Sequence, residues 1–222
     1  MPSNEFLRAN TGDRGPLVPQ RRSNAQNNAH KAFRTIAPSV DVVTLAEAKE
    51  FMNIPFSDDD TLIQAQIDAA TKWLEDWTRR AFIDQTWTLT FDEEPLQDWF
   101  DMPRPELQSI TQIESFVDDG TGTLFDLTKL IVSVNRLVGR VTLINGNTWP
   151  TDLRNAEAMF VTYVAGYGAL ATDVPDPLHE AILRFVDELY QHRCDVAIGA
   201  NVSSLVPFHT LTLAALYRIP KL

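Results

Sequence analysis

Residues 57–91 read SDDDTLIQAQIDAATKWLEDWTRRAFIDQTWTLTF, and the hydrophobic period changes within this stretch. In its first part, apolar residues recur at the spacing of one helix face, at Ile63, Ile67, Ala70, Leu74 and Trp77. This spacing predicts a long amphipathic helix over residues 57–80. From Gln85 to Phe91, apolar residues alternate strictly with threonines, which predicts a half-buried strand. Because a helical segment leads directly into a strand, α+β is the expected fold class.

Helix start signals lie before this stretch, at its beginning and after it. Thr44-Leu45-Ala46-Glu47 has the pattern of a capping box, which predicts a short helix over residues 44–53. Ser57–Asp60 supply hydrogen-bond acceptors and negative charge at the positive end of the long helix. Asp176-Pro177 places a capping residue before a proline at the first helical position, so a third helix is expected over residues 177–193.

The middle of the chain, residues 85–165, is expected to form antiparallel strands. Asp118–Gly122 is a turn cluster between two apolar runs and indicates a hairpin, and Asn145-Gly146 is another tight turn. The predicted architecture is a small helical bundle with an inserted antiparallel β section, in one domain over residues 41–200. A length of 222 residues is enough for one such core.

Charge is divided unevenly between the first 40 residues and the rest of the chain. The net charge of −11 argues against a general DNA-binding protein, because such binding depends on cationic contacts to phosphates. Residues 1–40 have a net charge of +4 and residues 41–222 a net charge of −15. The first 40 residues are also rich in Asn, Gln, Pro and Gly, which predicts an extended basic arm. This arm either orders against a partner or is a solvated leader.

Cysteine usage and hydropathy indicate a protein that folds in a reducing cytoplasm. Cys194 is the single cysteine, so neither an intramolecular disulfide nor a cysteine-based zinc site is expected. No stretch approaches the roughly 18 consecutive apolar residues of a membrane-spanning helix. The first residues lack the pattern of a secretory leader. We therefore expect no membrane partner.

No motif indicates a catalytic residue, a metal or a cofactor. The sequence has neither a phosphate-binding loop nor a nucleophile elbow, and His179-Glu180 is not followed by a second histidine because position 183 is Leu. The acidic run Asp58–Asp60 has a metal-site alternative, but a helix N-cap uses the same residues with no missing ligand. The sequence therefore predicts a protein that is not an enzyme.

Residues 201–222 form an apolar tail that begins in a loop of small and polar residues. Leu205–Phe208 is followed by apolar residues up to Tyr217, and the segment ends at Arg218. Such a tail is either the last core element or a docking peptide, and the spacing alone favours a core element.

Ten short segments follow one another in a characteristic order and spacing. They are Val43–Lys49, Ser57–Ile63, Ala69–Thr78, Gln85–Trp87, Met102–Ile110, Thr148–Pro150, Tyr163–Gly168, Val174–Pro177, Val206–Phe208 and Tyr217-Arg218. Together they resemble the head-to-tail connector (adaptor, or head-completion) proteins of long-tailed bacteriophages and gene transfer agents. The resemblance covers residues 41–218, so the arm before it has no counterpart there.

The resemblance implies a structural protein of the virion neck, between head and tail, that assembles in the host cytoplasm. Its subunits form a homo-oligomeric ring, commonly of twelve, that binds the portal protein, extends the DNA channel and presents a platform for a neck or tail completion protein. The acidic charge of residues 41–222 is consistent with a channel that repels phosphates, so that DNA passes without specific binding.

The resemblance also favours the docking alternative for the tail. The residues that we expect to contact the portal are Leu205, Val206, Pro207, Phe208, Leu211, Leu216, Tyr217 and Arg218. For the arm, we expect contacts with an acidic surface of a neighbouring subunit, the portal or the capsid, through Arg8, Arg14, Arg21, Arg22, Lys31 and Arg34.

Two other functions compete with the connector hypothesis. A DNA-packaging accessory protein would contact DNA through the basic arm. A virion-associated hydrolase would use paired carboxylates, and it would need a concave pocket that perturbs their acidity.

Overall fold

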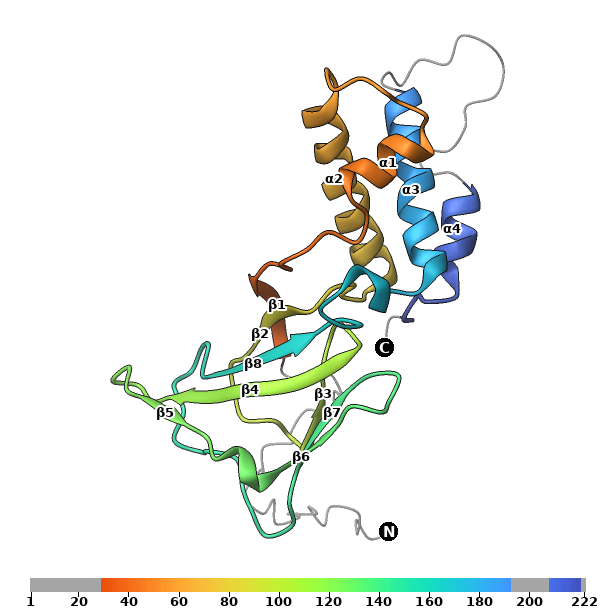
Figure 1. Cartoon of the computed structure of the whole chain (residues 1–222). Coiled ribbons are helices and arrows are strands. Elements are labelled where there is room, and N and C mark those ends of the chain that lie inside the picture. Colours follow the sequence, from red (N-terminus) through yellow and green to blue (C-terminus); the bar gives the residue numbers. More distant parts are fainter. Residues whose placement is uncertain (1–28, 193–207, 221–222) are drawn as a thin grey trace, which may run out of the picture.

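The structure is a computed structural model, and it describes residues 29–192 and 208–220. Helices gather at one end of the molecule and strands at the other (Figure 1). The elements, in chain order, are β1 (Ala29–Ile36), α1 (Leu45–Phe51), α2 (Asp60–Thr78), β2 (Gln85–Phe91), β3 (Trp99–Asp101), β4 (Leu107–Phe116), β5 (Gly122–Leu124), β6 (Leu130–Ser133), β7 (Arg140–Leu143), β8 (Met159–Ala165), α3 (Asp176–Gln191) and α4 (Phe208–Ala215). Short 3₁₀ helices cover Leu127–Lys129 and Ala171–Asp173.

The strands form two antiparallel sheets with an apolar core between them. The larger sheet has the order β1-β2-β8-β4-β5, and the smaller has the order β3-β7-β6. The register places the apolar side chains of Leu89 and Phe91 opposite Val161 and Met159 of β8. The ring of Phe91 then meets Phe100 of the smaller sheet with centroids 5.0 Å apart. The predicted antiparallel β section is thus a pair of packed sheets.

Strand β2 is more buried than its alternating sequence predicts. Thr88 and Thr90, expected on an exposed face, are each 7% exposed. The strand lies inside the larger sheet, between β1 and β8. The hydroxyl oxygens of Thr88 and Thr35 are 2.7 Å apart, so at least one threonine is partnered by the edge strand. The expectation of a half-buried strand was wrong because β1 was not foreseen.

Strand β1 lies within residues 1–40, the range predicted to be an extended arm. Its residues pair antiparallel with β2, in a register that runs from Ala29 opposite Phe91 to Ile36 opposite Thr86. Two irregularities interrupt this register, which matches the weak alternation of the sequence here. Residues 29–36 are therefore the edge strand of the larger sheet.

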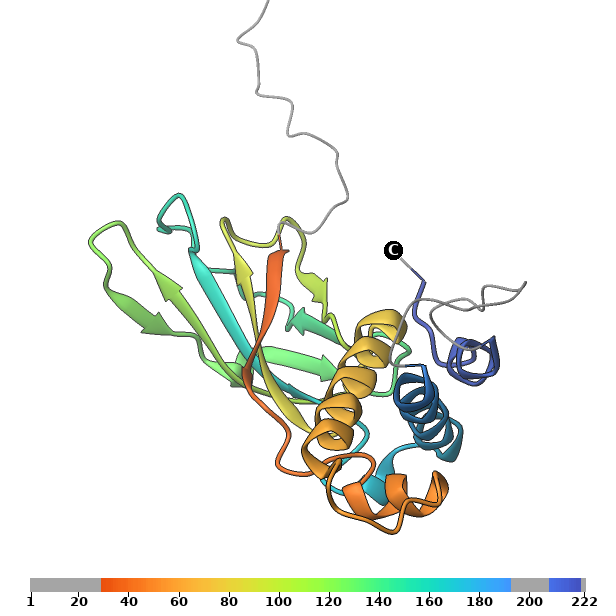
Figure 2. The same cartoon turned by 90° about the horizontal axis from the view of Figure 1, so that it is seen from above.

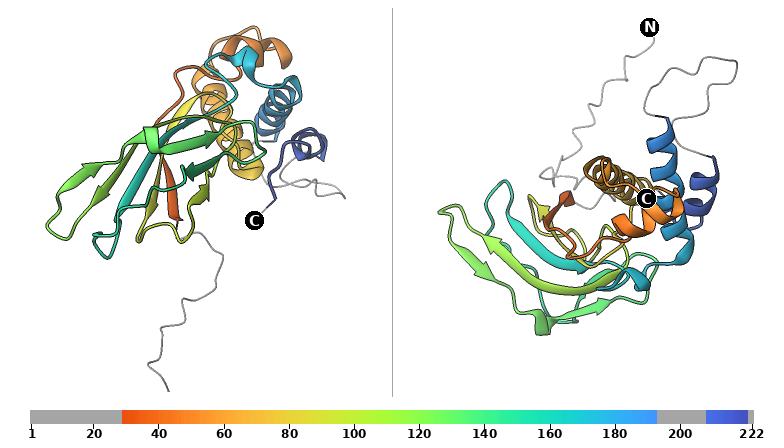
Figure 3. Two further views of the ribbon diagram at one scale, coloured as in Figure 1. Left: turned by 90° about the horizontal axis from the view of Figure 1, so that it is seen from below. Right: turned by 45° about the horizontal axis from the view of Figure 1, so that its top comes forward.

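The helices enclose a second apolar core, beside the β section (Figures 2 and 3). Ile63, Ile67 and Leu74 of α2 face this core, as their spacing predicts, together with Leu178 and Ile182 of α3. Each of these five side chains is at most 1% exposed.

Helix boundaries differ from the predicted ones by a few residues. The capping box of α1 is present: Glu47 N–H donates to the Thr44 hydroxyl, and Thr44 N–H donates to the Glu47 carboxylate. Helix α2 begins at Asp60 and α3 at Asp176, without a side-chain cap from the preceding residue in either case. In α3 the proline stands one position further along than predicted.

Helix α4 falls within the tail of residues 201–222, and it packs against α3 and the end of α2. Thr210 and Ala214 are fully buried in these contacts, whereas Phe208 and Leu216 are 75% and 83% exposed. Beyond the helix, Ile219 is buried again. In this structure the tail is thus joined to the helical core of its own subunit.

Candidate functional site

The helical core and the β section meet at a cluster of charged side chains, which we call the junction: Glu75, Arg80, Arg104 and Glu106. Glu75 and Arg80 come from the end of α2 and the turn after it, and Arg104 and Glu106 come from the segment before β4. Arg104 donates to the backbone carbonyl of Glu75 over 2.9 Å and to the Asp76 carboxylate over 2.6 Å. The junction therefore ties one core to the other through hydrogen bonds.

Aromatic rings complete the junction. The guanidinium of Arg104 lies 4.8 Å from the centre of the Trp87 ring, and that of Arg80 lies 5.8 Å from the centre of the Tyr167 ring. Both distances are within the range of cation–π attraction. Burial raises the pKa of Tyr167 to about 12, so its ring stays neutral in the physiological range.

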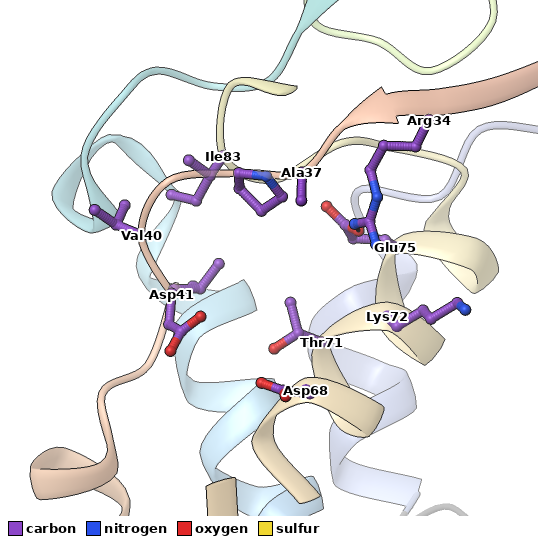
Figure 4. Close-up of a pocket in the computed structure, with 11 residues that line it drawn as sticks. Arg34, Ala37, Val40, Asp41, Asp68, Thr71, Lys72, Glu75 and Ile83 are labelled. Carbon is purple, nitrogen blue, oxygen red and sulfur yellow. Dashed lines mark ion pairs between the residues drawn. The ribbon is translucent and has the colours of Figure 1, made fainter. Parts of the chain in front are cut away.

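Glu75 is a carboxylate buried behind a pocket between β1, the segment after it and α2 (Figure 4). One carboxylate oxygen accepts from Phe82 N–H over 2.9 Å and from the Gln85 side chain over 2.7 Å. The other lies 3.9 Å from the Arg34 guanidinium, which also donates to Gln85. Burial is the largest influence on this group and raises the pKa of Glu75 despite these partners.

The pocket holds about 280 Å³ and combines an apolar wall with charged groups at its rim. Pro38, Val40 and Ile83 contribute to the wall, and Lys72 lies at the rim beside Glu75. Gln64 hydrogen-bonds the carboxylates of Asp41 and Asp68, so these two lining residues are held by the protein itself. The carboxylates of Asp41 and Asp68 thus share one amide donor at the pocket, and Glu75 is a third carboxylate in its lining.

The C-terminal segment ends on the junction. Arg80 Nε donates to the backbone carbonyl of Tyr217 over 2.6 Å. Ile219 N–H donates to the carbonyl of Thr78 over 3.0 Å, at the last residue of α2. The guanidinium of Arg218 lies 4.7 Å from the centre of a Trp77 ring. Three consecutive residues of the tail thus contact the end of one helix.

The predicted portal-contacting residues divide into three groups. Phe208 and Leu216 are exposed, on helix α4 and immediately after it. Leu211 and Tyr217 are partly buried, and Tyr217 packs against the helical core. Arg218 is exposed but stacked on Trp77, and the predicted contacts Leu205, Val206 and Pro207 lie outside the described residues.

Of the predicted arm contacts, Arg34 alone has a described side chain, and it contacts its own chain at Gln85 and Glu75. The backbone of Lys31 lies in β1. The remaining predicted contacts, Arg8, Arg14, Arg21 and Arg22, lie outside the described residues.

The acidic run before α2 has partners within the protein. Asp59 accepts from the Tyr190 hydroxyl over 2.6 Å, and Asp60 pairs with Lys49 over 2.5 Å. Within residues 29–192 and 208–220, no group of three or more His, Cys, Asp or Glu side chains has the arrangement of a metal site. In the same part of the chain, no helix has both the length and the apolar character needed to cross a membrane.

The chain is similar to one protein family and to several solved structures. Residues 42–103 match the family described as phage gp6-like head-tail connector protein. No curated protein matches the chain. Three similar solved structures, described as the neck of an empty gene transfer agent particle, the virion of a native particle and the neck of a native particle, give TM-scores of 0.74, 0.72 and 0.71. Their identities are 17%, 17% and 18%, and each match covers 87% of this chain and 97% of the other.

The family match is confined to residues 42–103, which lie within the range of the sequence resemblance, and the solved structures share the fold of the chain. The α+β fold is confirmed over most of the chain. The junction residues were not found by sequence reasoning. Glu75, Arg104 and Glu106 lie within segments that carry the family resemblance, but nothing in those segments indicated that these side chains meet. Arg79-Arg80 offered a further signal, because a helix C-terminus favours a cation.

Proposed function

We propose that this protein is a structural subunit of a particle neck, where copies form a ring between head and tail. The observation that carries the proposal is the fold, which matches gene transfer agent neck chains over 97% of their length. The family match over residues 42–103 supports the same function. A non-enzymatic role is part of this proposal, and the hydrogen-bonded carboxylates that line the pocket of Figure 4 are consistent with it.

The proposed ring has twelve copies, sits beneath the portal and extends its channel. Two of the neck structures with a similar fold were computed with C6 and C12 symmetry. This symmetry supports a ring with a multiple of six subunits. DNA passes through the channel without specific contacts, because residues 41–222 have a net charge of −15 and repel phosphates. Native mass spectrometry of the protein with its portal tests the stoichiometry. A complex with fewer than six copies per portal ring would contradict the proposal.

The tail is proposed to supply the portal contact. Phe208 and Leu216 support this assignment because residues 29–192 and 208–220 leave these apolar side chains 75% and 83% exposed. We expect Phe208→Ser and Leu216→Ser each to weaken portal binding by about thirtyfold, the effect of losing an interface hot spot. The stability of the free subunit should not change, because neither side chain is buried.

A matched control is Leu170→Ser, at an apolar residue that is 60% exposed and lies outside the tail. Its portal affinity should equal that of the native protein, measured by biolayer interferometry on immobilised portal. Equal weakening by all three substitutions would point to general loss of surface apolarity and would reject the docking assignment. Point substitutions are preferable to deletion of the tail, because deletion would also expose the helical core beneath Ala214 and Ile219.

The basic residues before β1 are proposed to dock on an acidic surface of a neighbouring subunit, the portal or the capsid. Their positive charge, opposite in sign to the rest of the chain, supports an electrostatic contact. Removal of residues 1–28, which leaves the edge strand intact, should weaken assembly more at low salt than at high salt. An effect that is the same at all salt concentrations would contradict this contact. A salt-dependent gel shift of short duplex DNA by the full chain would favour a DNA contact instead.

A further inference from the structure

The segment proposed to dock on the portal is attached to its own subunit at the junction. Its attachment has two parts: helix α4 packs on α3, and residues 217–219 contact the end of α2. The backbone groups of the segment that hydrogen-bond to its own subunit are not free to hydrogen-bond to a portal at the same time. The strength of each part therefore decides how the segment is released.

The contact made by helix α4 is mainly with α3, and Leu213 packs against the helical core beside the buried residues. The fully buried residues of α4 are Thr210 and Ala214, which are small, and its large apolar end residue Phe208 is exposed. The Thr210 hydroxyl is buried with no hydrogen-bond partner in the structure as described. An unpartnered buried hydroxyl destabilises the packed state, because the group loses its bond to water without replacement.

The contact made by residues 217–219 includes a hydrogen bond from one charged side chain. Arg80 is 6% exposed, donates Nε to the Tyr217 carbonyl over 2.6 Å and pairs through Nη1 with Glu106 over 2.5 Å. A hydrogen bond from a charged donor is about twice as strong as one between neutral groups. Ile219, also 6% exposed, is held next to it by the bond to Thr78.

We propose that Arg80 is a latch, which holds the C-terminal segment on its own subunit before assembly and whose release frees the segment for the portal. The inference rests on the proposed docking function. Breaking the Arg80–Tyr217 bond leaves the segment held by the packing of α4 on α3 and by Ile219, while the buried Thr210 hydroxyl opposes the packed state. The segment then exchanges between bound and free states, and the free state adds the residues that are buried on the subunit, such as Ile219, to the already exposed Phe208 and Leu216.

The test compares Arg80→Ala with Arg104→Ala in the full-length protein without portal, by amide hydrogen exchange. Arg104 is a matched control because it is a junction arginine with its own carboxylate and aromatic partners, and its side-chain contacts are with Glu75, Asp76 and Trp87. We expect amides of residues 208–219 to exchange about tenfold faster in Arg80→Ala and at the native rate in Arg104→Ala. Exchange in α3 and β8 should stay unchanged in both.

A second variant keeps the test decisive where Arg80→Ala unfolds the protein. Ile219→Asp leaves Arg80 and Glu106 in place and removes the apolar anchor beside the latch, so it should accelerate exchange in the same segment alone. If Arg80→Ala or Ile219→Asp folds and the amides of residues 208–219 still exchange at the rate of the unsubstituted protein, the inference is overturned. Equal acceleration by Arg104→Ala would also overturn it, because the effect would then belong to the junction as a whole.

Portal affinity separates this inference from the proposed function. Faster exchange together with at least threefold tighter portal binding by Arg80→Ala supports both. Faster exchange with unchanged portal binding supports the latch contact and overturns the docking role proposed for the segment.

Discussion

The guanidinium of Arg34 lies 3.9 Å from the carboxylate of Glu75, so an edge strand of the sheet is joined to the longest helix by an ion pair. Glu75 is the buried partner and Arg34 the exposed one. The pair spans the boundary between the two apolar cores, beside the pocket of Figure 4. The charge state of the Glu75 carboxylate should therefore affect the stability of the subunit.

The stability of the protein should depend on pH through Glu75. Burial raises the pKa of Glu75 above its ordinary value of 4.5, so the folded protein binds a proton that the unfolded chain has released. The stabilisation from this group is complete below pH 4.5 and is lost as the pH rises through the raised pKa. Glu75→Gln has no such titrating group, so it should not lose this stabilisation. We expect its unfolding free energy to increase relative to that of the native protein between pH 4.5 and 8.

Urea unfolding at several pH values measures this difference. Glu50→Gln is the control, since Glu50 is exposed on α1 and its substitution makes the same chemical change away from the buried site. A constant difference between the native protein and Glu75→Gln across the pH range would contradict the assignment of the raised pKa.

The capping box of α1 should contribute measurably to stability. Thr44→Ala removes the hydroxyl that accepts from Glu47 N–H, and we expect it to lower the unfolding free energy by about 1 kcal/mol. Thr44→Ser keeps the hydroxyl and should cost less than about half as much. Thermal unfolding followed by circular dichroism distinguishes them, and equal losses would show that the methyl group of Thr44 matters instead.

Gly166 should tolerate no side chain, because it closes the turn after β8 against another backbone. A Cβ at this position would lie 2.4 Å from Asp84 N and 2.5 Å from the carbonyl carbon of Ile83. We expect Gly166→Ala to destabilise the protein by about 3 kcal/mol, since neither backbone atom can move independently.

Gly120→Ala separates backbone conformation from steric contact. Gly120 also has a positive φ, of +84°, but nothing lies within 4 Å of an added Cβ. Its substitution should cost about 1 kcal/mol, the strain of the left-handed conformation alone. Chemical denaturation gives both values, and a Gly166→Ala loss no larger than that of Gly120→Ala would contradict the close approach.

The two apolar cores should unfold together because the junction connects them. Ile67 belongs to the helical core and Phe100 to the β core, and both are at most 1% exposed. We expect Ile67→Ala to cost about 3 kcal/mol and Phe100→Ala about 4 kcal/mol. Tryptophan fluorescence and far-ultraviolet circular dichroism should show one coincident transition for each variant. A second transition in either one would show that the cores are independent.

Local sequence patterns predicted most elements of the fold. The spacing of Ile63, Ile67 and Leu74 predicted α2, and the turn cluster Asp118–Gly122 predicted the hairpin of β4 and β5. These signals are local because a helix face and a tight turn are each formed by residues close in the chain. The edge strand β1 was missed because its weak alternation gains meaning only from its pairing with β2.

The sequence by itself determined the class of fold, most of its elements and the opposite charges of its first 40 residues and the remainder. Tertiary structure alone decided that Arg34 meets Glu75, and that Arg80 reaches Tyr217 across 137 positions of sequence. The reason is physical: periodicity specifies which face of an element is apolar, but a contact between distant polar groups depends on how the packed elements lie in space. The junction that holds the C-terminal segment is of that second kind.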